Sequence, residues 1–383
     1  MTRQSFLSAV AVLALASACA APDASVAPGA PGALDAASFD RGSGNAPLYL
    51  VTLQDDVRDV RAVARELGVR GNFGIVAVRE HAARGFDAVI PPSAMAAVRA
   101  DSRVKFIEAD HVVTLRLPEA TAKPGGGGGS ASQQTPWGIT RVGGAGDGTG
   151  KTAWIIDTGI DLDHADLNTS RNCHVNYTRS GSADDGNGHG THVAGTVAAI
   201  NNSIGVVGVA ANAYVCAVRV LDNRGSGQYS WIVNGVNYVA ANGKSGEVAN
   251  MSLGGSGSNA TLEQAVSDAA SKGIKFSLAA GNDGAFAGNF TPARVNGNNI
   301  YTISAIASSG CMASWSNWGN PPVDYAAPGV SVLSTWKGGG TNTISGTSMA
   351  APHVAGILLL GSVRANGYAT CDPDGNPDPI ASR

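Results

Sequence analysis

The chain has 383 residues and a net charge of −3, and it is 44% hydrophobic but only 14% charged. This length allows one large hydrophobic core together with a smaller domain. The nearly balanced charge argues against nucleic acid as the main partner. The 51 glycines favour a compact protein with many tight turns.

The first 19 residues are predicted to be a signal peptide. Arg3 precedes a largely apolar run from Phe6 to Ala18, which is too short to span a bilayer. The small residues at 16–18 match a cleavage site, and Cys19 directly after them leaves lipid anchoring open as an alternative. We therefore expect export by a bacterium and an extracellular mature protein, secreted or anchored through Cys19, with no transmembrane segment.

Residues 20–46 are rich in Ala, Gly, Pro and Ser and are predicted to form a linker. A small domain at 47–116 follows, with strands predicted at 48–53, 73–78, 86–90 and 104–107 and helices at 57–67 and 92–99. The order βαββαβ predicts a ferredoxin-like α+β sandwich. Residues 117–134 include five consecutive glycines, so we expect a flexible, protease-accessible linker there.

The second domain is predicted to cover residues 135–383. Apolar runs of strand length at 153–156, 214–221, 248–253, 274–280 and 300–307 alternate with helical segments at 191–200, 229–241, 262–271 and 348–363. Continuous apolar strands that alternate with helices are typical of a parallel sheet covered on both faces. The predicted fold class is therefore α/β, with a doubly wound, mostly parallel sheet.

Four polar residues stand at the ends of these predicted elements. Ser348 follows a small-residue turn and opens an apolar helix, whose N-terminus favours negative charge. Asp157 ends a buried strand, where the sites of open α/β sheets collect. His189 stands between glycines at the start of a helix, and Asn282 follows a strand. Each residue alone is more typical of a cap or a turn than of a site.

Together the four residues predict a nucleophilic site. Ser348 would attack a carbonyl carbon, His189 would accept its proton, and Asp157 would orient the imidazole. The Asn282 side chain and the Ser348 backbone N–H would stabilise the oxyanion that forms.

Three other interpretations of these motifs are disfavoured. Residues 145–152 nearly match a phosphate-binding loop, but they precede a strand and begin with Ala145 in place of Gly. His189 and His192 have the spacing of a zinc pair, but no third soft ligand follows nearby, so we expect His192 to pack inside its helix. An esterase of the α/β-hydrolase type would carry Ser348 in Gly-x-Ser-x-Gly, which this chain does not.

Five motifs in this order resemble the subtilisin-like serine proteases, and within them the proteinase K-like group. They are Asp157-Thr-Gly-Ile, Gly188-His-Gly-Thr-His-Val-Ala-Gly-Thr196, Ala249-Asn-Met-Ser-Leu-Gly-Gly255, Ala279-Ala-Gly-Asn-Asp283 and Gly346-Thr-Ser-Met-Ala-Ala-Pro-His-Val-Ala-Gly356. The resemblance covers about residues 137–360, and its order of Asp, His and Ser is the one that this family shows. It implies a secreted serine endopeptidase that acts through an acyl-enzyme, with broad preference for unfolded protein.

The resemblance also implies how the protein is made. The small N-terminal domain looks like an inhibitor I9-type propeptide, most clearly at Glu108-Ala-Asp-His111. Such a propeptide assists folding and blocks the cleft, so we expect a self-processing zymogen that is cleaved between about Leu115 and Gln133. A catalytically silent subtilase-like binding module is the alternative, although none of the four key residues is missing.

The same resemblance suggests how a substrate binds. Gly225-Ser226-Gly227 and Ser252-Leu253-Gly254 look like the two edges that hold an extended peptide. Ala279-Ala280-Gly281 would form the floor of the first pocket, with room for a large apolar side chain, and Tyr229 would line a pocket further out. The expected partners are protein and peptide substrates and the chain's own propeptide, and we expect a monomer.

No cofactor is expected for the chemistry, but structural calcium is implied by the resemblance. Asp324 matches a calcium ligand of the proteinase K-like group, with carbonyl ligands at Asn298 and Ile300. The alternating carboxylates at 372–378 could also hold calcium, but the prolines there and the missing distal Glu favour a solvated turn.

Four cysteines remain in the mature chain, an even number that predicts two disulfides in an exported protein. Three connectivities are open, and proximity in sequence favours Cys173–Cys216 and Cys311–Cys371. Past Gly361 the chain is shorter than in the proteinase K-like group, so part of the usual final packing is expected to be absent or replaced by the segment around Cys371.

Overall fold

The computed structural model of the chain describes Met1 and residues 47–118 and 132–383. The predicted signal peptide beyond Met1, the whole 20–46 linker and most of the Gly-rich linker lie outside the described residues. Residues 47–118 and 132–383 belong to one compact unit. Every helix among the described residues is too short or too polar to cross a bilayer.

The N-terminal domain has the predicted βαββαβ order. Its elements are β1 (Leu48–Leu53), α1 (Val60–Gly71), β2 (Ile75–Arg79), β3 (Gly85–Val89), α2 (Pro92–Arg99) and β4 (Val104–Ala109). The strands form one antiparallel sheet in the order β2-β3-β1-β4. Helix α1 begins three residues later than predicted, because the Asp59 side chain caps it by accepting the N–H of Ala62 at 2.8 Å.

The larger domain is built on a nine-stranded sheet in the order β20-β21-β17-β16-β14-β12-β7-β10-β8. All neighbouring strands are parallel except β20 and β21. The strands are β7 (Thr152–Asp157), β8 (Val175–Asn176), β10 (Tyr214–Arg219), β12 (Val248–Met251), β14 (Lys275–Ala279), β16 (Ile300–Ile306), β17 (Val323–Pro328), β20 (Arg364–Tyr368) and β21 (Pro379–Ser382).

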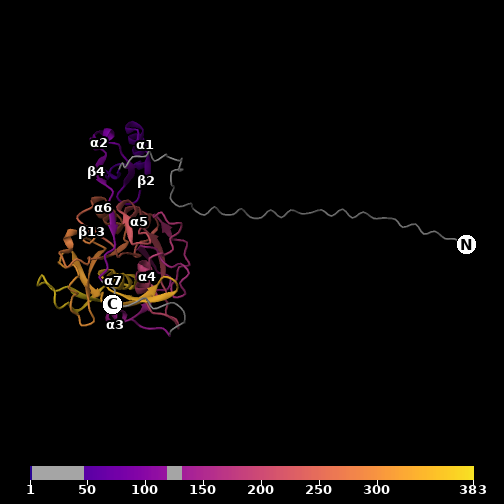
Figure 1. Cartoon of the computed structure of the whole chain (residues 1–383), viewed down its shortest axis with the longest axis vertical. Coiled ribbons are helices and arrows are strands. Elements are labelled where there is room, and N and C mark those ends of the chain that lie inside the picture. Colours follow the sequence, from indigo (N-terminus) through magenta and orange to yellow (C-terminus); the bar gives the residue numbers. More distant parts are fainter. Residues whose placement is uncertain (2–46, 119–131) are drawn as a thin grey trace. The chain divides into compact units, whose positions relative to one another are not determined.

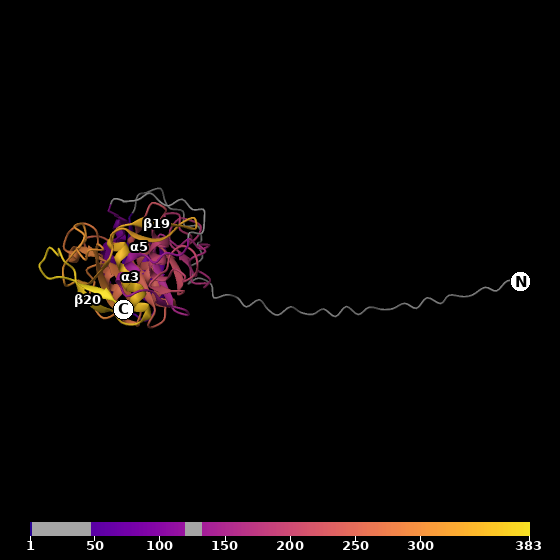
Figure 2. The same cartoon turned by 90° about the horizontal axis from the view of Figure 1, so that it is seen from below.

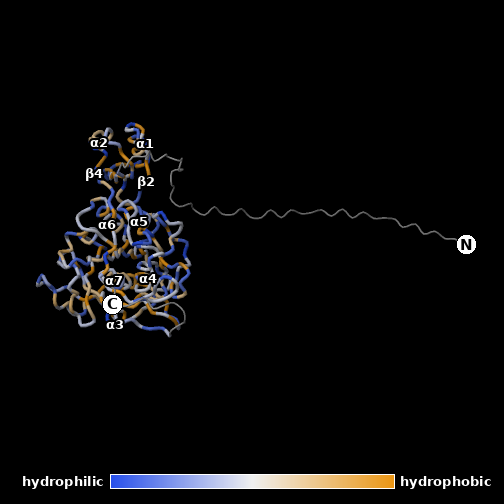
Figure 3. The backbone as a smooth tube through the Cα atoms, in the orientation of Figure 1, coloured by the Kyte–Doolittle hydropathy of each residue, from blue (hydrophilic) through white to orange (hydrophobic). Residues whose placement is uncertain are grey.

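Helices cover both faces of this sheet, as predicted. Helices α4 (His189–Ala198) and α7 (Thr347–Leu360) pack against each other on one face, and α5 (Tyr229–Asn242) and α6 (Ala260–Ser271) pack on the other (Figure 1). Alternate residues of β7 show the two layers, since Ile155 belongs to the core with α4 and α7, and Ile156 to the core with α5 and α6. Hydrophobic residues concentrate at α4 and α7 (Figure 3).

Shorter elements connect the sheet and form its edges. They are β5 (Val112–Thr114), α3 (Trp137–Arg141), β6 (Gly146–Asp147), β9 (Ala210–Ala211), β11 (Ser226–Gln228), β13 (Gly255–Ser256), a 3₁₀ turn (Ala287–Asn289), β15 (Phe290–Thr291), β18 (Val332–Trp336) and β19 (Gly340–Ile344). The segment that resembles a phosphate-binding loop contains β6 and leads into β7 rather than into a helix. It therefore lacks the strand–loop–helix context that such a loop needs.

The two favoured disulfides are confirmed. Cys173 is bonded to Cys216 of β10, and Cys311 is bonded to Cys371, which lies between β20 and β21. The C-terminal hairpin lies at the edge of the large sheet, with the C-terminus beside β20 (Figure 2). Because β21 pairs with β17, the segment past Gly361 extends the sheet.

Candidate active site

The fold brings three of the predicted residues to one end of the sheet. Asp157 is the last residue of β7, His189 is the first residue of α4, and Ser348 is the second residue of α7. Helices α4 and α7 pack against each other and both contact β7. Residues far apart in the sequence therefore meet because two buried helices begin beside the carboxyl end of one strand.

Asp157 and His189 form a buried pair. Asp157 Oδ1 lies 2.8 Å from His189 Nδ1, and both side chains are completely buried. Burial opposes the charged imidazole, but the charge and hydrogen bond of Asp157, together with Asp185, outweigh it and raise the pKa of His189 above 6.5. The carboxylate accepts the Nδ1 proton, which leaves Nε2 as the lone-pair nitrogen of the neutral ring.

Asp185 supports this pair and was not predicted from the sequence. Its buried carboxylate accepts the hydroxyl of Thr158 at 2.9 Å, and the N–H and hydroxyl of Thr191 at 2.9 and 2.6 Å. It also accepts the N–H of Gly188 at 2.9 Å, so it caps the N-terminus of α4. An acid a few residues before a helix start is a capping signature, and that signal could have identified Asp185.

A glycine next to His189 permits the close packing of α4 on the strand end. A Cβ atom on Gly190 would lie 2.1 Å from the carbonyl oxygen of Gly159, which is closer than any side chain can approach. The neighbouring Gly188 has φ of 111°, a left-handed conformation that glycine adopts readily. Both glycines are needed to hold the imidazole beside Asp157.

The hydroxyl of Ser348 is directed at a carbonyl rather than at His189. Ser348 Oγ donates to the carbonyl oxygen of Ser252 at 3.2 Å, and Ser252 Oγ donates to the carbonyl oxygen of Ser348 at 2.8 Å. The buried Nε2 of His189 has no hydrogen-bond partner among the described residues. The predicted hydrogen bond between serine and histidine is thus not made in this conformation, because the serine rotamer turns its proton toward Ser252.

Asn282 holds the carbonyl of another part of the chain. Its side-chain nitrogen donates to the carbonyl oxygen of Arg116 at 2.7 Å. Its side-chain oxygen accepts the N–H of Thr347 at 2.8 Å and the hydroxyl of Thr347 at 2.9 Å. The amide is therefore oriented with its donor toward Arg116. Thr347 performs this orientation and was not predicted, because a Thr beside a helix start has no distinctive sequence signal.

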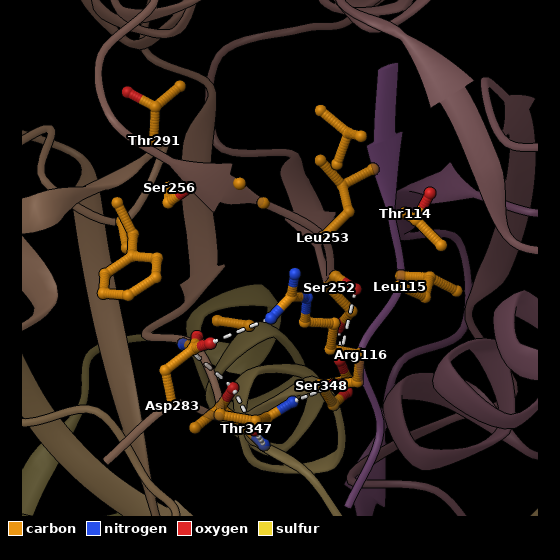
Figure 4. Close-up of a pocket in the computed structure, with 18 of the residues that line it drawn as sticks. Thr114, Leu115, Arg116, Ser252, Leu253, Ser256, Asp283, Thr291, Thr347 and Ser348 are labelled. Carbon is orange, nitrogen blue, oxygen red and sulfur yellow. Dashed lines mark hydrogen bonds and ion pairs between the residues drawn. The ribbon is translucent and has the colours of Figure 1, made fainter. Parts of the chain in front are cut away.

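These residues surround a cavity of about 370 Å³. It is lined by most of the predicted binding residues together with Ser348 and Asn282, namely Tyr229, Ser252, Leu253, Gly254, Ala279, Ala280 and Gly281. Residues 111–116 of the N-terminal domain line the same cavity, and Figure 4 shows Arg116 between Leu253 and Thr347, with Leu115 beside Thr114. The predicted pocket residues are thus brought together around a segment of the chain itself.

The remaining predicted edge, Gly225–Gly227, binds this segment through the backbone. Strand β5 pairs antiparallel with β11, with Thr114 opposite Ser226. The pairing continues where the N–H of Leu115 donates to the carbonyl oxygen of Gly225 at 2.9 Å. Residues 112–116 are therefore held in the extended form that a peptide adopts when it adds to a sheet edge.

Two carboxylates of the N-terminal domain cap helices of the larger domain. Glu108 accepts the N–H groups of Ala260 and Thr261, each at 2.8 Å, at the start of α6. Asp110 accepts the N–H of Ser230 at 3.0 Å and its hydroxyl at 2.6 Å, at the start of α5. A helix N-terminus stabilises a negative charge, so these contacts position residues 111–116 over the cavity.

The predicted metal ligand Asp324 lies on β17, which pairs with the strand β16 that carries Ile300. Asp324 Oδ2 accepts the N–H of Thr302 at 2.8 Å, which places the carboxylate near the beginning of β16, two residues after Ile300. Burial raises the pKa of Asp324 to about 6. The described residues contain no group of three or more His, Cys, Asp or Glu side chains that could hold a metal. A site here would therefore depend on carbonyl oxygens, such as those expected from Asn298 and Ile300.

The other two candidate metal sites, at His192 and at residues 372–378, are explained by hydrogen bonds within the protein. His192 is buried within α4 and its Nε2 lies 2.9 Å from the carbonyl oxygen of Val332, while burial lowers its pKa to about 3. In the tail, Asp372 accepts the N–H of Asp378 at 3.1 Å, and Asp374 accepts that of Asn376 at 2.8 Å. Both carboxylates therefore serve a turn, which agrees with the favoured interpretation of this segment.

Comparison with known proteins places this geometry in a family. The family model described as "Subtilase family" matches residues 148–369. The chain is 40% identical over 299 residues to alkaline serine exoprotease A of Vibrio alginolyticus, covering 75% of this chain and 53% of that protein. It is 42% identical over 281 residues to the subtilisin-like serine protease AsES of Sarocladium strictum, covering 72% of this chain and 69% of that protein.

A solved structure shows the same fold. The crystal structure of a cold adapted subtilisin-like serine proteinase is 38% identical to this chain, with a TM-score of 0.56, and covers 64% of this chain and 96% of that one. The matches therefore span about half of the Vibrio protein and nearly all of the solved chain. Asp157, His189 and Ser348 all lie within the residues that the family model matches. The chain belongs to the subtilase family of serine proteases.

Proposed function

We propose that this chain is the precursor of a secreted serine endopeptidase that cleaves its own N-terminal domain from the catalytic domain. The observation that carries this proposal is the 2.7 Å hydrogen bond from Asn282 to the carbonyl oxygen of Arg116. An amide that binds the oxygen of a peptide carbonyl beside a nucleophile stabilises the oxyanion formed on attack. The peptide bond between Arg116 and Leu117 is therefore the proposed processing site, inside the expected range of 115–133.

The neighbouring residue supports the same bond. A Cβ atom on Gly346 would lie 3.4 Å from Leu117 Cδ2 and 3.6 Å from the side-chain nitrogen of Asn282. Leu117 therefore lies against the turn that carries Ser348, just past the carbonyl held by Asn282. The segment crosses the site in the order that hydrolysis of this bond requires.

The proposed chemistry needs one rotation before the first step. Ser348 Oγ leaves the carbonyl of Ser252 and donates to Nε2 of His189. Oγ then attacks the carbonyl carbon of Arg116 while Nε2 takes the proton, Asp157 stabilises the imidazolium, and Asn282 stabilises the oxyanion. The tetrahedral species collapses, the bond to the Leu117 nitrogen breaks, and the imidazolium returns its proton to that leaving amine.

The second half of the reaction releases the new carboxyl terminus. The remaining ester joins Ser348 Oγ to the Arg116 carbonyl carbon. Water gives a proton to His189 and attacks this ester, and Ser348 recovers its proton when the ester bond breaks. The same steps on an external peptide constitute the proposed endopeptidase activity.

After cleavage, the N-terminal domain is proposed to remain bound as a product inhibitor. The contacts of Glu108 and Asp110 and the pairing of β5 with β11 do not depend on the bond after Arg116. The domain would leave only when these contacts are lost or when it is itself degraded.

A Ser348→Ala precursor tests the proposal. We expect it to keep the full mass after signal removal, whereas the unaltered chain releases a fragment that ends at Arg116, as read by mass spectrometry. Ser345→Ala is the matched control, because Ser345 lies in the same turn but its hydroxyl accepts the N–H of Ser331. Normal maturation of Ser348→Ala expressed alone would show that the chain does not cleave itself.

A covalent label distinguishes an active endopeptidase from the alternative, a catalytically silent binding module. A fluorophosphonate reacts with an activated serine, so it should label Ser348 once the N-terminal domain has gone. An unlabelled mature protein would favour the silent module.

The proposed location is outside the cell. Two disulfides support an oxidising compartment, because cytosolic thiols are kept reduced. We also propose that the mature protein is a monomer. Mass spectrometry of the unprocessed Ser348→Ala precursor tests export through removal of the signal peptide, and would detect a lipid on Cys19 if the anchor is present.

Calcium is proposed as a structural ligand at Asp324. The buried carboxylate and its raised pKa fit a nearby cation, which would stabilise the charged form. Asp324 would hold the ion, with carbonyl groups of Asn298 and Ile300 completing the shell. The ion would supply stability and no part of the peptide-bond chemistry.

A further inference from the structure

Arg219 is a buried cation at the end of β10, beside the candidate active site. It lies opposite Asp157 in the register of β10 and β7, and the residue is only 2% exposed. Burial lowers the pKa of Arg219, but the carboxylates of Asp185, Asp184 and Asp222 oppose this shift, and a guanidinium stays charged in proteins. A buried charge is costly unless polar groups surround it, so the hydrogen bonds of this side chain hold the segments that supply them.

The guanidinium of Arg219 joins two loops on either side of β10. Its Nη1 donates to the carbonyl oxygen of Ser182 at 3.2 Å and to the carbonyl oxygen of Asp184. Its Nη2 donates to the side-chain oxygen of Asn223 at 2.5 Å. The first loop continues into Asp185, which caps α4, and the second continues into β11. Because a guanidinium is planar and rigid, these contacts fix the two loops relative to each other.

A second contact holds Asn223 from the other side. Its carbonyl oxygen accepts the side-chain N–H of Asn187 at 3.0 Å. The side-chain oxygen of Asn187 accepts the N–H of His189 at 3.2 Å. Asn223 is therefore connected through its side chain to Arg219 and through its backbone to the first residue of α4. Asn223 is itself exposed, so its substitution leaves no buried cavity.

Asn223 lies in a closed turn that leads into the Gly225–Gly227 edge. The Asp222 carboxylate accepts the N–H of Ser226 at 3.0 Å, and the N–H of Asp222 donates to the carbonyl oxygen of Ser226 at 2.8 Å. Beyond this turn, the carbonyl oxygen of Gly225 accepts the N–H of Leu115, and β11 pairs with β5. A shift of the turn would therefore move the backbone groups with which the bound segment pairs.

We propose that Arg219 and Asn223 are positioning residues, which hold the Gly225–Gly227 edge where an extended substrate can pair with it. This inference rests on the proposed endopeptidase function and assigns a part in it to two residues that the sequence did not indicate. The affected substrate residues begin at the second residue before the cleaved bond, as Leu115 does in the precursor. Pairing with the edge is made in the bound substrate and in the transition state alike, so its loss should appear mainly in KM.

Two p-nitroanilide substrates of different length provide the test. Acetyl-Val-Val-Thr-Leu-Arg p-nitroanilide carries the sequence of residues 112–116, and acetyl-Arg p-nitroanilide lacks every residue that pairs with the edge. The enzyme is obtained by expressing the full chain and allowing it to mature, and kcat and KM are measured for both substrates. Asn223→Ala removes the acceptor, whereas Asn223→Asp keeps an acceptor for the guanidinium. Arg224→Gln is the matched control, because Arg224 is exposed in the same turn and contacts Asp222 through its backbone N–H.

The ratio of kcat/KM for the longer substrate to that for the shorter one should fall about fivefold in Asn223→Ala, because a hydrogen bond to a charged group is lost. The fall should come from a higher KM for the longer substrate, with its kcat within about twofold of the unaltered value. Asn223→Asp and Arg224→Gln should keep the ratio of the unaltered enzyme.

Three results would overturn the positioning role while leaving the endopeptidase function intact. They are an unchanged ratio in Asn223→Ala, an equal loss on both substrates in Asn223→Ala, and a loss in Asn223→Asp as large as that in Asn223→Ala. If the matured, unaltered enzyme hydrolyses neither substrate nor an unfolded protein, the proposed function fails, and this inference fails with it.

Discussion

Ser252 and Ser348 exchange two hydrogen bonds across the candidate active site. The hydroxyl of Ser252 donates to the carbonyl oxygen of Ser348, and the hydroxyl of Ser348 donates to the carbonyl oxygen of Ser252. Ser252 follows β12 and Ser348 lies in the first turn of α7, so the exchange ties a cleft edge to the nucleophile's helix. In the proposed mechanism, attack requires the Ser348 hydroxyl to leave this carbonyl for Nε2 of His189.

Ser252→Ala is expected to destabilise the protein by about 1–2 kcal/mol, because it removes a buried donor to the Ser348 carbonyl. The carbonyl of Ser252 is retained, so Ser348 keeps its resting acceptor and we expect less than about a tenfold loss in kcat. Urea unfolding on a Ser348→Ala background measures the first effect without self-digestion. Exposed Ser203→Ala is the control and should stay within about 0.5 kcal/mol. Equal stabilities of the two variants would contradict this account.

The pH dependence of activity should report His189. The ring acts as a base only when neutral, and its pKa is raised above 6.5, so kcat/KM should rise with pH through a midpoint above 6.5. Asp157→Asn removes the charge that raises this pKa, so residual activity should have a lower midpoint. Its kcat should fall by about 10⁴-fold. Asp374→Asn, in the exposed tail, is the matched control. An unshifted midpoint in Asp157→Asn would mean that another group controls the acid limb.

The orientation of the Asn282 amide predicts a graded series. Asn282→Ala should lower kcat by about 10²–10³-fold, because it removes a donor to the oxyanion. Thr347→Val removes only the hydroxyl that orients the amide, so kcat should fall by about tenfold with little change in KM. Thr347→Ser keeps this hydroxyl and should restore activity. An equal loss of activity in Thr347→Ser and Thr347→Val would show that the hydroxyl's hydrogen bond to Asn282 does not account for the loss.

The N-terminal domain should lose affinity when its helix caps are weakened. Glu108→Gln replaces charged acceptors at the start of α6, and we expect the cleaved domain to dissociate about tenfold faster. The rate at which peptidase activity appears after processing measures this release. Glu66→Gln is the control, because Glu66 pairs with Arg103 on the same domain. Similar release rates for the two variants would argue against the capping role.

Calcium binding is tested by stability. A Ser348→Ala sample stripped with chelator should gain several degrees in Tm when calcium is returned in large excess over its Kd. Asp324→Asn should abolish most of this gain, whereas Asp372→Asn should retain it if the tail is a turn. No gain in the stripped parent protein would remove calcium from both places.

Local sequence signals predicted elements best where a chemical rule sets a boundary. Helix α2 has the predicted bounds. Proline fits the first position of a helix but disrupts a helix interior, so Pro92 marks the start of α2. Helix α7 ends at Leu360 rather than at 363, since Gly361 interrupts it. Strand β17 was missed because Asp324 and Tyr325 interrupt its apolar run, and the strand is recognised only through its pairing with β16.

The site also contains residues that the sequence reveals and residues that only the structure reveals. The chemical types and order of Asp157, His189, Asn282 and Ser348 are visible in the sequence, because each stands in a short motif at the end of an element. The sequence did not identify the residues that hold the site in place, namely Asp185, Thr347 and Asn317, whose side chain accepts the N–H of Asp283. Their roles lie in hydrogen bonds to residues that neighbouring sequence does not specify.

By itself, the sequence determined which residues could perform the chemistry, the two-layered covering of the sheet and the presence of a separate N-terminal domain. Only the tertiary structure decided that Arg116 presents its carbonyl to Asn282 and its guanidinium to Asp283, and that the Ser348 proton is directed to Ser252. The physical reason is range. Helices, caps and strands follow from interactions between near neighbours in the chain, whereas the serine rotamer and the carbonyl in the cleft are set by packing between segments 96 and 166 residues apart.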